Sequence, residues 1–347
     1  MLVDSPHKTS EITIAQSPTP LQRIGYGSCG SVWADTSRYP DIDHCESALV
    51  LKRADGLPDR SIENEANTHK HIMSCIEASG DLHGSNAFSS SFYVNIPTHT
   101  AFLNPGTPTW GDILPRLPAG SNPCQALRFW NGPADKMDSI IDDKRNEHCL
   151  IRPYLGRRRT GANSTGGHRR SMLRSISLRN YPLHIDQMEA LGLPTHEYAS
   201  AMADALAFLL WVAEIDACDV EYVLARPRSG NASLGTHCFT GSSLGPHALW
   251  VLDFDCCKPL PMTLEGVHCV VERFWRNDPF YPNPDTKCEE DELLWAIFRG
   301  RFLDTSGKIM ASKEDHRDIL DLPEQFIKRI IKTTGMYSKG VPTDSPT

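Results

Sequence analysis

The N-terminal part of the chain carries a glycine-rich turn and a lysine that could both contact a phosphate group. Gly25, Gly27 and Gly30 fit the pattern G-x-G-x-x-G-x-V, which ends at Val32. Without a Cβ atom, glycine lets backbone N–H groups approach phosphate oxygens closely. Lys52 closes an apolar run, from which its ammonium could reach the same anion. These residue types predict a phosphate-binding site, and a simple tight turn with a solvent-exposed lysine is the alternative.

A carboxylate in the next segment could hold this lysine in place. Residues 61–78 have the apolar spacing of a helix, with Ser61 as its N-cap. At about 100° per residue, Glu65 falls within the apolar face of this helix and Glu63 falls outside it. Because a carboxylate on a buried face needs a cation, we expect Glu65 to pair with Lys52.

Two acidic segments follow in the second half of the chain. Asp216 and Glu221 lie five residues apart between an apolar helix and a short strand, where exposed acidic surface is the alternative interpretation. Asp253 and Asp255 follow the apolar residues 248–252. A carboxylate at the end of a buried strand is unfavourable unless it is paired or bound to a metal. Asp253 is therefore the first candidate for a metal ligand.

The elements that must position these residues change in type along the chain. Three short apolar runs between residues 21 and 52 predict an antiparallel meander. Further helices are predicted at residues 185–191, 199–213, 289–302 and 324–332. An order in which strands come first and helices follow predicts an α+β, two-lobed fold, with a β-rich N-terminal lobe and an α-rich C-terminal lobe.

Composition shifts divide the chain further. We expect a flexible leader at 1–20, an N-terminal lobe with insertions and a hinge at 21–156, a basic flexible insertion at 157–180, an α-rich lobe at 181–335 and a tail at 336–347. The insertion belongs to a run of eight arginines without an acid between Arg152 and Arg179. Such a run is a solvated loop, a nuclear-import signal or a phosphate-binding patch.

Charge and cysteine usage exclude several classes of protein. With a net charge of −8 over 347 residues, binding of nucleic acid through bulk positive charge is not expected. No secretory signal and no membrane span is apparent, so we expect a cytoplasmic protein, with a nuclear location as the alternative. Eleven cysteines without a CxxC pair fit reduced thiols. The spacing of His237, Cys238, His268 and Cys269 matches no zinc finger, so zinc is not expected.

Several phrases of the sequence resemble a family of fungal domains of unknown function, sometimes labelled zinc-finger-like, with a protein-kinase-like fold. The phrases are RSIENE at 60–65, CLIRPYLGRRR at 149–159, SLRNYPLH at 177–184, residues 216–224 and FWRNDP at 274–279. The resemblance covers about residues 21 to 335. It implies a fold more than an activity, because that family has no established activity.

The resemblance implies a role for each residue singled out above. The three glycines and Val32 would cover the triphosphate of ATP, and Lys52, steadied by Glu65, would touch it. Residues 149–156 would form the hinge against which adenine docks. Asp216 would be the catalytic base, and Glu221 and Asp253, with Asp255 as an extra carboxylate, would hold Mg²⁺.

Several positions depart from the protein-kinase pattern. Glu214 and Ile215 stand where protein kinases have His-Arg, Glu221 replaces a metal-binding Asn, and Asp255 replaces the glycine of D-F-G. The first hypothesis is therefore an ATP- and Mg²⁺-binding phosphotransferase with an unknown phosphoacceptor or protein partner. The alternatives are an inactive pseudokinase that serves as an interaction module, and a nuclear regulatory factor that uses the Arg-rich insertion.

Overall fold

The computed structural model describes a defined set of residues, and every structural statement below concerns them. They are residues 21–34, 49–53, 57, 60–81, 94–97, 101–103, 111–115, 143, 146, 149–159, 180–227, 238–241, 244–284, 288–313 and 319–337. The predicted leader, most of the basic insertion and the end of the tail lie outside these residues.

The first sheet is antiparallel and has five strands in the order β1-β2-β3-β6-β5. The strands are β1 (Gln22–Tyr26), β2 (Ser31–Ala34), β3 (Leu49–Arg53), β5 (Ala101–Leu103) and β6 (Gly111–Pro115). The meander predicted for the first three strands is confirmed. Val50 and Leu51 of β3 are buried, as expected for an apolar run inside a sheet.

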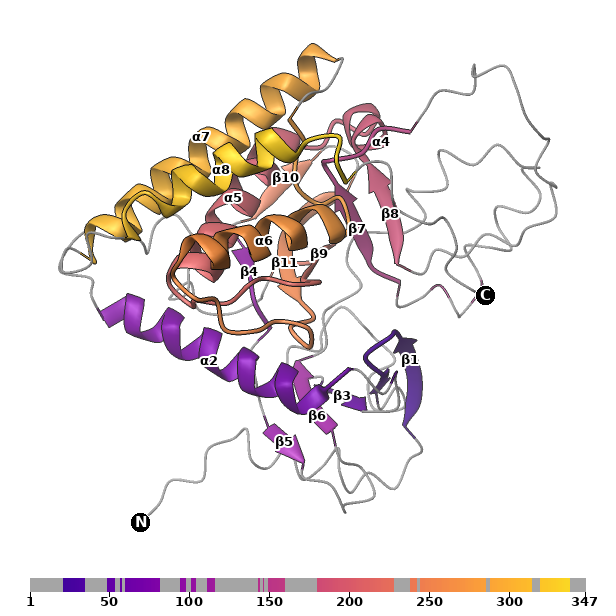
Figure 1. The fold of residues 1–347 in the computed structure, drawn as a ribbon. Helices are drawn as coiled ribbons and strands as arrows, with labels where there is room; N and C mark the ends of the chain where they lie inside the picture. The colour runs from indigo at the N-terminus through magenta and orange to yellow at the C-terminus, as the bar shows by residue number, and fades with distance from the viewer. Residues whose placement is uncertain are drawn as a thin grey trace.

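Helix α2 (Ile62–Asp81) follows the meander and begins where the sequence predicted. The backbone N–H of Asn64 donates to the Ser61 hydroxyl at 3.0 Å, so Ser61 caps the helix. Glu65 is 2% exposed, whereas Glu63 is exposed, which confirms the predicted face. In Figure 1, α2 runs beneath the helical part of the molecule and meets the first sheet at one end.

The second sheet has six strands in the order β10-β11-β9-β7-β8, with β4 added beside β11. The strands are β4 (Val94–Asn95), β7 (Ile151–Tyr154), β8 (Tyr181–His184), β9 (Glu221–Ala225), β10 (Phe239–Gly241) and β11 (Gly245–Leu252). We expected residues 149–156 to end the N-terminal lobe. The structure instead pairs β7 with β8 and β9, because the buried side chains of Ile151 and Tyr154 join the core of the second sheet.

Five helices accompany this sheet. They are α4 (Ile185–Ala190), α5 (Thr195–Trp211), α6 (Leu264–Arg276), α7 (Glu289–Ala311) and α8 (Leu322–Thr333). Helix α5 is buried on nearly all sides, as its apolar sequence predicted, and α7 packs along it (Figure 1). The buried carboxylate of α5, Asp204, accepts hydrogen bonds from Arg301 at 2.7 and 2.8 Å. That pairing removes the main penalty of burying its charge.

Helix α6 and the strands β5, β6, β8 and β10 were missed by sequence reasoning. Helix α6 shows a readable signal, because Val267, Val270, Val271 and Phe274 recur at helical spacing and are buried. Thr263 caps this helix by accepting from the Gly266 N–H at 3.2 Å. Strand β8 has only four residues and includes Pro182, so its sequence gave no clear strand pattern.

The described chain thus combines α and β structure in six helices and two sheets. The predicted mixture of both types, with sheet first and most helices later, is confirmed at that level. None of the helices among the described residues has the length and apolar character needed to cross a lipid bilayer.

Candidate functional site

Lys52 lies where the first sheet, helix α2 and the segment after β11 meet. In the register between β2 and β3, Lys52 is opposite Val32, so both side chains leave the same face of the sheet. The Lys52 ammonium donates to Glu65 Oε1 at 2.7 Å and to Asp253 Oδ1 at 2.9 Å. The structure therefore brings together three residues that are separated by up to 201 positions in the chain.

The charges of these groups stabilise one another in a buried position. Burial alone lowers the pKa of Lys52, but Asp253 and Glu65 outweigh it and raise that pKa well above its usual value. Burial also opposes ionisation of Asp253, yet Lys52 holds the pKa of this carboxyl below its usual range. Lys52 is therefore a permanent cation here, available to an anionic group.

The turn after β11 fixes both aspartates. Asp253 has a φ of 69°, a left-handed conformation that an L residue with a side chain adopts rarely. Arg60 donates to both Asp255 oxygens, at 3.2 and 3.1 Å. The Asn64 side chain donates to the backbone carbonyls of Asp255 and Cys257, at 2.8 and 3.0 Å. The start of α2 is thus tied directly to the segment that carries the two candidate metal ligands.

The glycine-rich turn lies against this group of residues. The Gly27 N–H donates to the Gly30 carbonyl at 2.7 Å and closes the turn between β1 and β2. A Cβ atom added at Gly27 would meet nothing within 4 Å, so packing within the described chain does not demand glycine there. Cys29, inside the turn, is 3% exposed, and its thiol donates to Glu65 Oε2 at 3.4 Å. Gly25 lies on β1 opposite Val32.

Asp216, the predicted catalytic base, is held by its own loop. Its Oδ1 atom accepts from the backbone N–H groups of Cys218 at 3.2 Å and Lys258 at 2.9 Å. Its Oδ2 atom lies 3.7 Å from Arg273 Nε. Burial raises the pKa of Asp216, against the lowering effect of these hydrogen bonds. The residue is therefore part of the loop structure, with one oxygen left outside the backbone hydrogen bonds.

Asn277 is a positioning residue that sequence reasoning missed. Its side chain donates to the Ala217 carbonyl at 2.9 Å and accepts from the Asp219 N–H at 2.8 Å. Ala217 and Asp219 both have positive φ values, 47° and 61°. The side chain thus stabilises a strained loop. The only hint in the sequence was the phrase FWRNDP around this residue.

Glu221, a predicted metal ligand, is paired with Arg152 of β7 through the Nη2 and Oε1 atoms. Arg152 also donates to Asp278 at 3.0 Å. Burial raises the pKa of Glu221 to about 8, Arg152 opposing this and the charges of Asp253 and Asp278 adding to it. The pKa of Glu221 therefore depends on the charge of Asp253. The direct partner of Glu221 is Arg152, which lies where a metal would bind.

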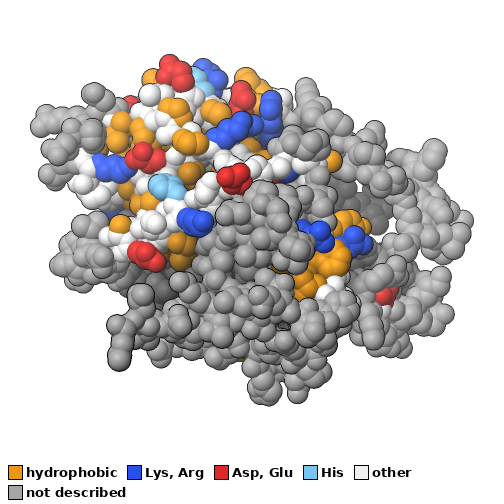
Figure 2. Space-filling model, turned by 90° about the horizontal axis from the view of Figure 1, so that it is seen from below, with side chains coloured by type: hydrophobic (Ala, Val, Ile, Leu, Met, Phe, Trp, Pro, Cys, Tyr) orange, Lys and Arg blue, Asp and Glu red, His pale blue; other side chains and the backbone are white. Residues whose placement is uncertain are grey.

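Arg158 and Arg159 of the basic run are also paired. Arg158 donates to Glu189 at 2.6 and 2.7 Å and to Asp291 at 2.6 Å, and Arg159 donates to Asp186 at 2.9 Å. On the described part of the face in Figure 2, basic and acidic side chains are interspersed. Residues 160–179 lie outside the described residues. Only residues 152–159 of the predicted basic run are therefore described.

The arrangement around Lys52 combines cations with a surplus of carboxyl groups. Lys52 and Arg60 contact four of them, those of Glu65, Asp219, Asp253 and Asp255. Two positive charges cannot neutralise four carboxylates, so a divalent cation would be favoured electrostatically at this position. A lysine beside such a cation could in turn contact phosphate oxygens.

Comparisons with known proteins give one match. A family model described as "Zinc finger protein" matches residues 249–314. The resemblance to a kinase-like family that the sequence phrases suggested is therefore wrong, because the matching model carries a different description. No curated protein and no solved structure matches the chain.

The cysteines and histidines of the matched segment do not gather into a zinc finger within the part of it that the structure describes. Cys257 is buried, whereas His268 and Cys269 are exposed on α6, and Cys288 donates to Glu290 at 2.7 Å. Two groups of candidate ligands do come within 4.8 Å of one another, namely Cys29 with Asp253 and Asp255, and Cys256 with Asp219 and Asp255. Each contains one thiol, whereas structural zinc sites use four Cys or His ligands.

Proposed function

We propose that the protein binds ATP with Mg²⁺ and transfers its terminal phosphoryl group to an unidentified acceptor. The observation that carries this proposal is the pair of contacts from the Lys52 ammonium to Glu65 and Asp253. Phosphoryl transfer depends on positioning and on neutralising the phosphate charge, which a fixed lysine and a carboxylate-bound Mg²⁺ supply together.

The proposal includes a two-lobed organisation of the protein-kinase type, as a fold and without membership of a kinase family. The sheet order β1-β2-β3-β6-β5 with α2 attached supports the smaller lobe. The antiparallel pair β9 and β11, each adjoining one of the two acidic segments, supports the larger lobe. The glycine-rich turn would then cover the phosphates, with its backbone N–H groups as donors.

Each residue has a role that its contacts support. Lys52 would bind the phosphates, Asp253 would hold Mg²⁺ through the oxygen that Lys52 leaves free, and Asp255 would add charge from behind, held by Arg60. Asp216 Oδ2 would accept the acceptor's proton, a task that its raised pKa suits. Glu221 would contribute only if Arg152 moved away.

A second candidate function is a nucleotide-binding module without phosphotransferase activity. It is favoured by the position of Asp216, which is 3% exposed and engaged with loop amides. In that case the same Lys52 contacts would bind nucleotide, and bound nucleotide would stabilise a surface for a protein partner.

One pair of substitutions separates the two candidates. Both backbone hydrogen bonds to Asp216 end on Oδ1, so Asp216→Asn keeps the acceptor oxygen and removes the charge. We would incubate wild type and Asp216→Asn with ATP labelled in its terminal phosphate, plus Mg²⁺, and measure label released to water or bound to protein. The phosphotransferase predicts turnover by wild type and at least a hundredfold loss in Asp216→Asn.

The binding module predicts a different pattern. Neither protein would turn ATP over, and both would gain the same increase in melting temperature from ATP with Mg²⁺. An absence of any nucleotide-dependent shift in wild type would reject both candidates.

A further inference from the structure

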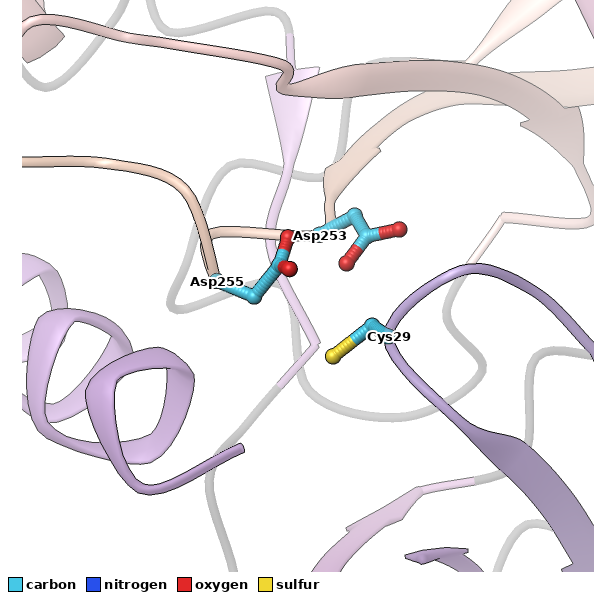
Figure 3. Close-up of side chains that lie close together, drawn as sticks. All are labelled: Cys29, Asp253 and Asp255. Carbon is cyan, nitrogen blue, oxygen red and sulfur yellow. The ribbon is translucent and has the colours of Figure 1, made fainter. Parts of the chain in front are cut away.

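Cys29, Asp253 and Asp255 form a group of metal-ligating side chains that mixes a thiol with carboxylates. Their ligand atoms lie within 4.8 Å of one another. Figure 3 shows Cys29, from the glycine-rich turn, lying close to the two aspartates of the segment after β11. Cys29 is 3% exposed and Asp255 is 5% exposed, so two of the three ligands are buried, and the Asp253 side chain is 21% exposed. Ligands around a tetrahedral zinc ion are about 3.5 Å apart, so small movements would complete the geometry.

The carboxyl groups of Asp253 and Asp255 lie close to each other and to the Cys29 sulfur. Two carboxylates at this separation repel each other. A divalent cation bound to both carboxylates and to the sulfur would remove that repulsion.

We propose that Cys29, Asp253 and Asp255 bind one divalent cation of the zinc class. A thiolate ligand selects Zn²⁺ over Mg²⁺, which prefers oxygen ligands and keeps several waters. On binding, the cation forms one bond to sulfur and bonds to two carboxylates. The Cys29 thiol proton leaves to solvent as the sulfur–metal bond forms, so the site gains one net positive charge beside its carboxylates.

The neighbouring cations do not prevent this binding. A carboxylate has about four lone-pair sites and can accept from a donor while it coordinates a metal. Lys52 contacts Asp253 at Oδ1, which leaves Oδ2 for the ion. Arg60 holds Asp255 from the other side at 3.1 and 3.2 Å. Outer partners of this kind orient the ligands of many metal sites.

The second group of candidate ligands, Asp219, Asp255 and Cys256, is a weaker site. Arg60 Nη1 lies 2.7 Å from Asp219 and 3.1 Å from Asp255, so a guanidinium already joins two of its three members. In this group Arg60 contacts two of the three members and the Asp219 side chain is 44% exposed, whereas in the group with Cys29 it contacts Asp255 alone. We therefore assign Asp255 to the metal site that contains Cys29.

A cation held by Cys29 would fix the glycine-rich turn onto the segment after β11. Cys29 belongs to that turn, and Asp253 is the proposed Mg²⁺ ligand. The bound zinc-class ion would therefore compete with nucleotide and Mg²⁺ for the same space. The metal site itself requires no nucleotide, so it can be tested separately from the proposed phosphotransferase activity.

The test uses Co²⁺ as a spectroscopic substitute for Zn²⁺ in the full-length protein without nucleotide. A cobalt–thiolate bond gives a charge-transfer band in the near ultraviolet. We expect one equivalent of Co²⁺ per chain with such a band, reversed by Zn²⁺. Cys29→Ser should lose the band and bind Co²⁺ at least tenfold more weakly. Cys256→Ser, which removes the thiol of the competing group, and Cys269→Ser, on the surface of α6, should keep both.

Each other outcome overturns the proposal. Retention of the band in folded Cys29→Ser, or its loss in Cys256→Ser, would assign the metal to other thiols. X-ray absorption of the zinc-loaded wild type needs no variant and should show one sulfur neighbour among oxygen neighbours. No sulfur neighbour, or three or more, would reject the site whatever the variants do. These measurements do not depend on ATP binding, so a protein that fails to bind ATP could still show the metal site.

Discussion

The two acidic segments of this protein contain the same residue types and use them differently. Asp253 and Asp255 follow β11 and contact cations from distant elements, Lys52 and Arg60. Asp216 precedes β9 and accepts from backbone N–H groups of Cys218 and Lys258. A carboxylate paired with a side-chain cation can exchange that partner for a ligand, whereas one bonded to the backbone stabilises the loop itself. The contacts of Asp253 therefore suit binding of a ligand, whereas those of Asp216 fix its position and leave Oδ2 outside the backbone hydrogen bonds.

The largest expected effect lies at the Lys52 pairing. Lys52→Met leaves the buried carboxylates of Glu65 and Asp253 without their cation. Removing one partner of a buried pair destabilises a protein by about 3–5 kcal/mol, and we expect a loss of that order in the free energy of unfolding. Urea denaturation measures it.

A second substitution tests the cause. Adding Glu65→Gln to Lys52→Met should recover part of the loss, because the remaining charge is removed as well. A loss in the double variant equal to the sum of the losses in the single variants Lys52→Met and Glu65→Gln would show that Lys52 and Glu65 do not interact.

The Asp216 loop should respond more weakly and in another way. Asp216→Ala removes the acceptor for two backbone N–H groups, which costs about 1–3 kcal/mol of unfolding free energy. Asp216→Asn keeps Oδ1 and should stay within about 0.5 kcal/mol of wild type. The difference between the two variants, measured by thermal and urea unfolding, isolates the role of the acceptor. A similar loss in both variants would mean that the charge, through Arg273, stabilises the loop.

The smallest effect concerns His247, a buried residue near the start of β11. His247 is fully buried, with Nδ1 2.7 Å from the Gly245 carbonyl and Nε2 bonded to the Tyr198 hydroxyl. Burial lowers the pKa of His247, against the opposing effects of Gly245 and Glu197. Its contribution to stability is therefore complete above the unfolded pKa of about 6.5 and is lost as the pH falls below it.

The measurement compares unfolding free energies at about pH 7.5 and about pH 5.5. Below pH 6.5 this residue contributes a slope of at most about 1.4 kcal/mol per pH unit. His247→Gln should lose that part of the slope, while His268→Gln, on the exposed face of α6, should keep it. An unchanged slope in His247→Gln would mean that His247 titrates alike in the folded and unfolded states.

Much of the fold and part of the site could be predicted from local sequence. The buried face of α2 followed from its apolar spacing, the burial of α5 followed from its continuous apolar sequence, and Glu65 was identified because it interrupts an apolar face. Lys52 and Asp253 were predicted from their places at strand ends. These predictions needed only the period of one element and the penalty for burying a charge.

The rest depended on contacts between distant segments. No local pattern shows that Asn277 holds the 217–219 loop, that Arg152 pairs with Glu221, or that β7 joins the second sheet. Likewise, Cys29 and Asp253 become neighbours only when the first sheet packs against the segment after β11. The phrases that resembled a kinase-like family were also an unsafe guide, since the matched family model has another description.

The most direct test of the Lys52 site is a calorimetric titration of wild type, Asp253→Asn and Asp216→Asn with ATP, with and without Mg²⁺. The account predicts Mg²⁺-dependent binding to wild type, a loss of at least tenfold, about 1.4 kcal/mol, in Asp253→Asn, and unchanged affinity in Asp216→Asn. Equal affinity in wild type and Asp253→Asn, or no binding to wild type, would contradict it.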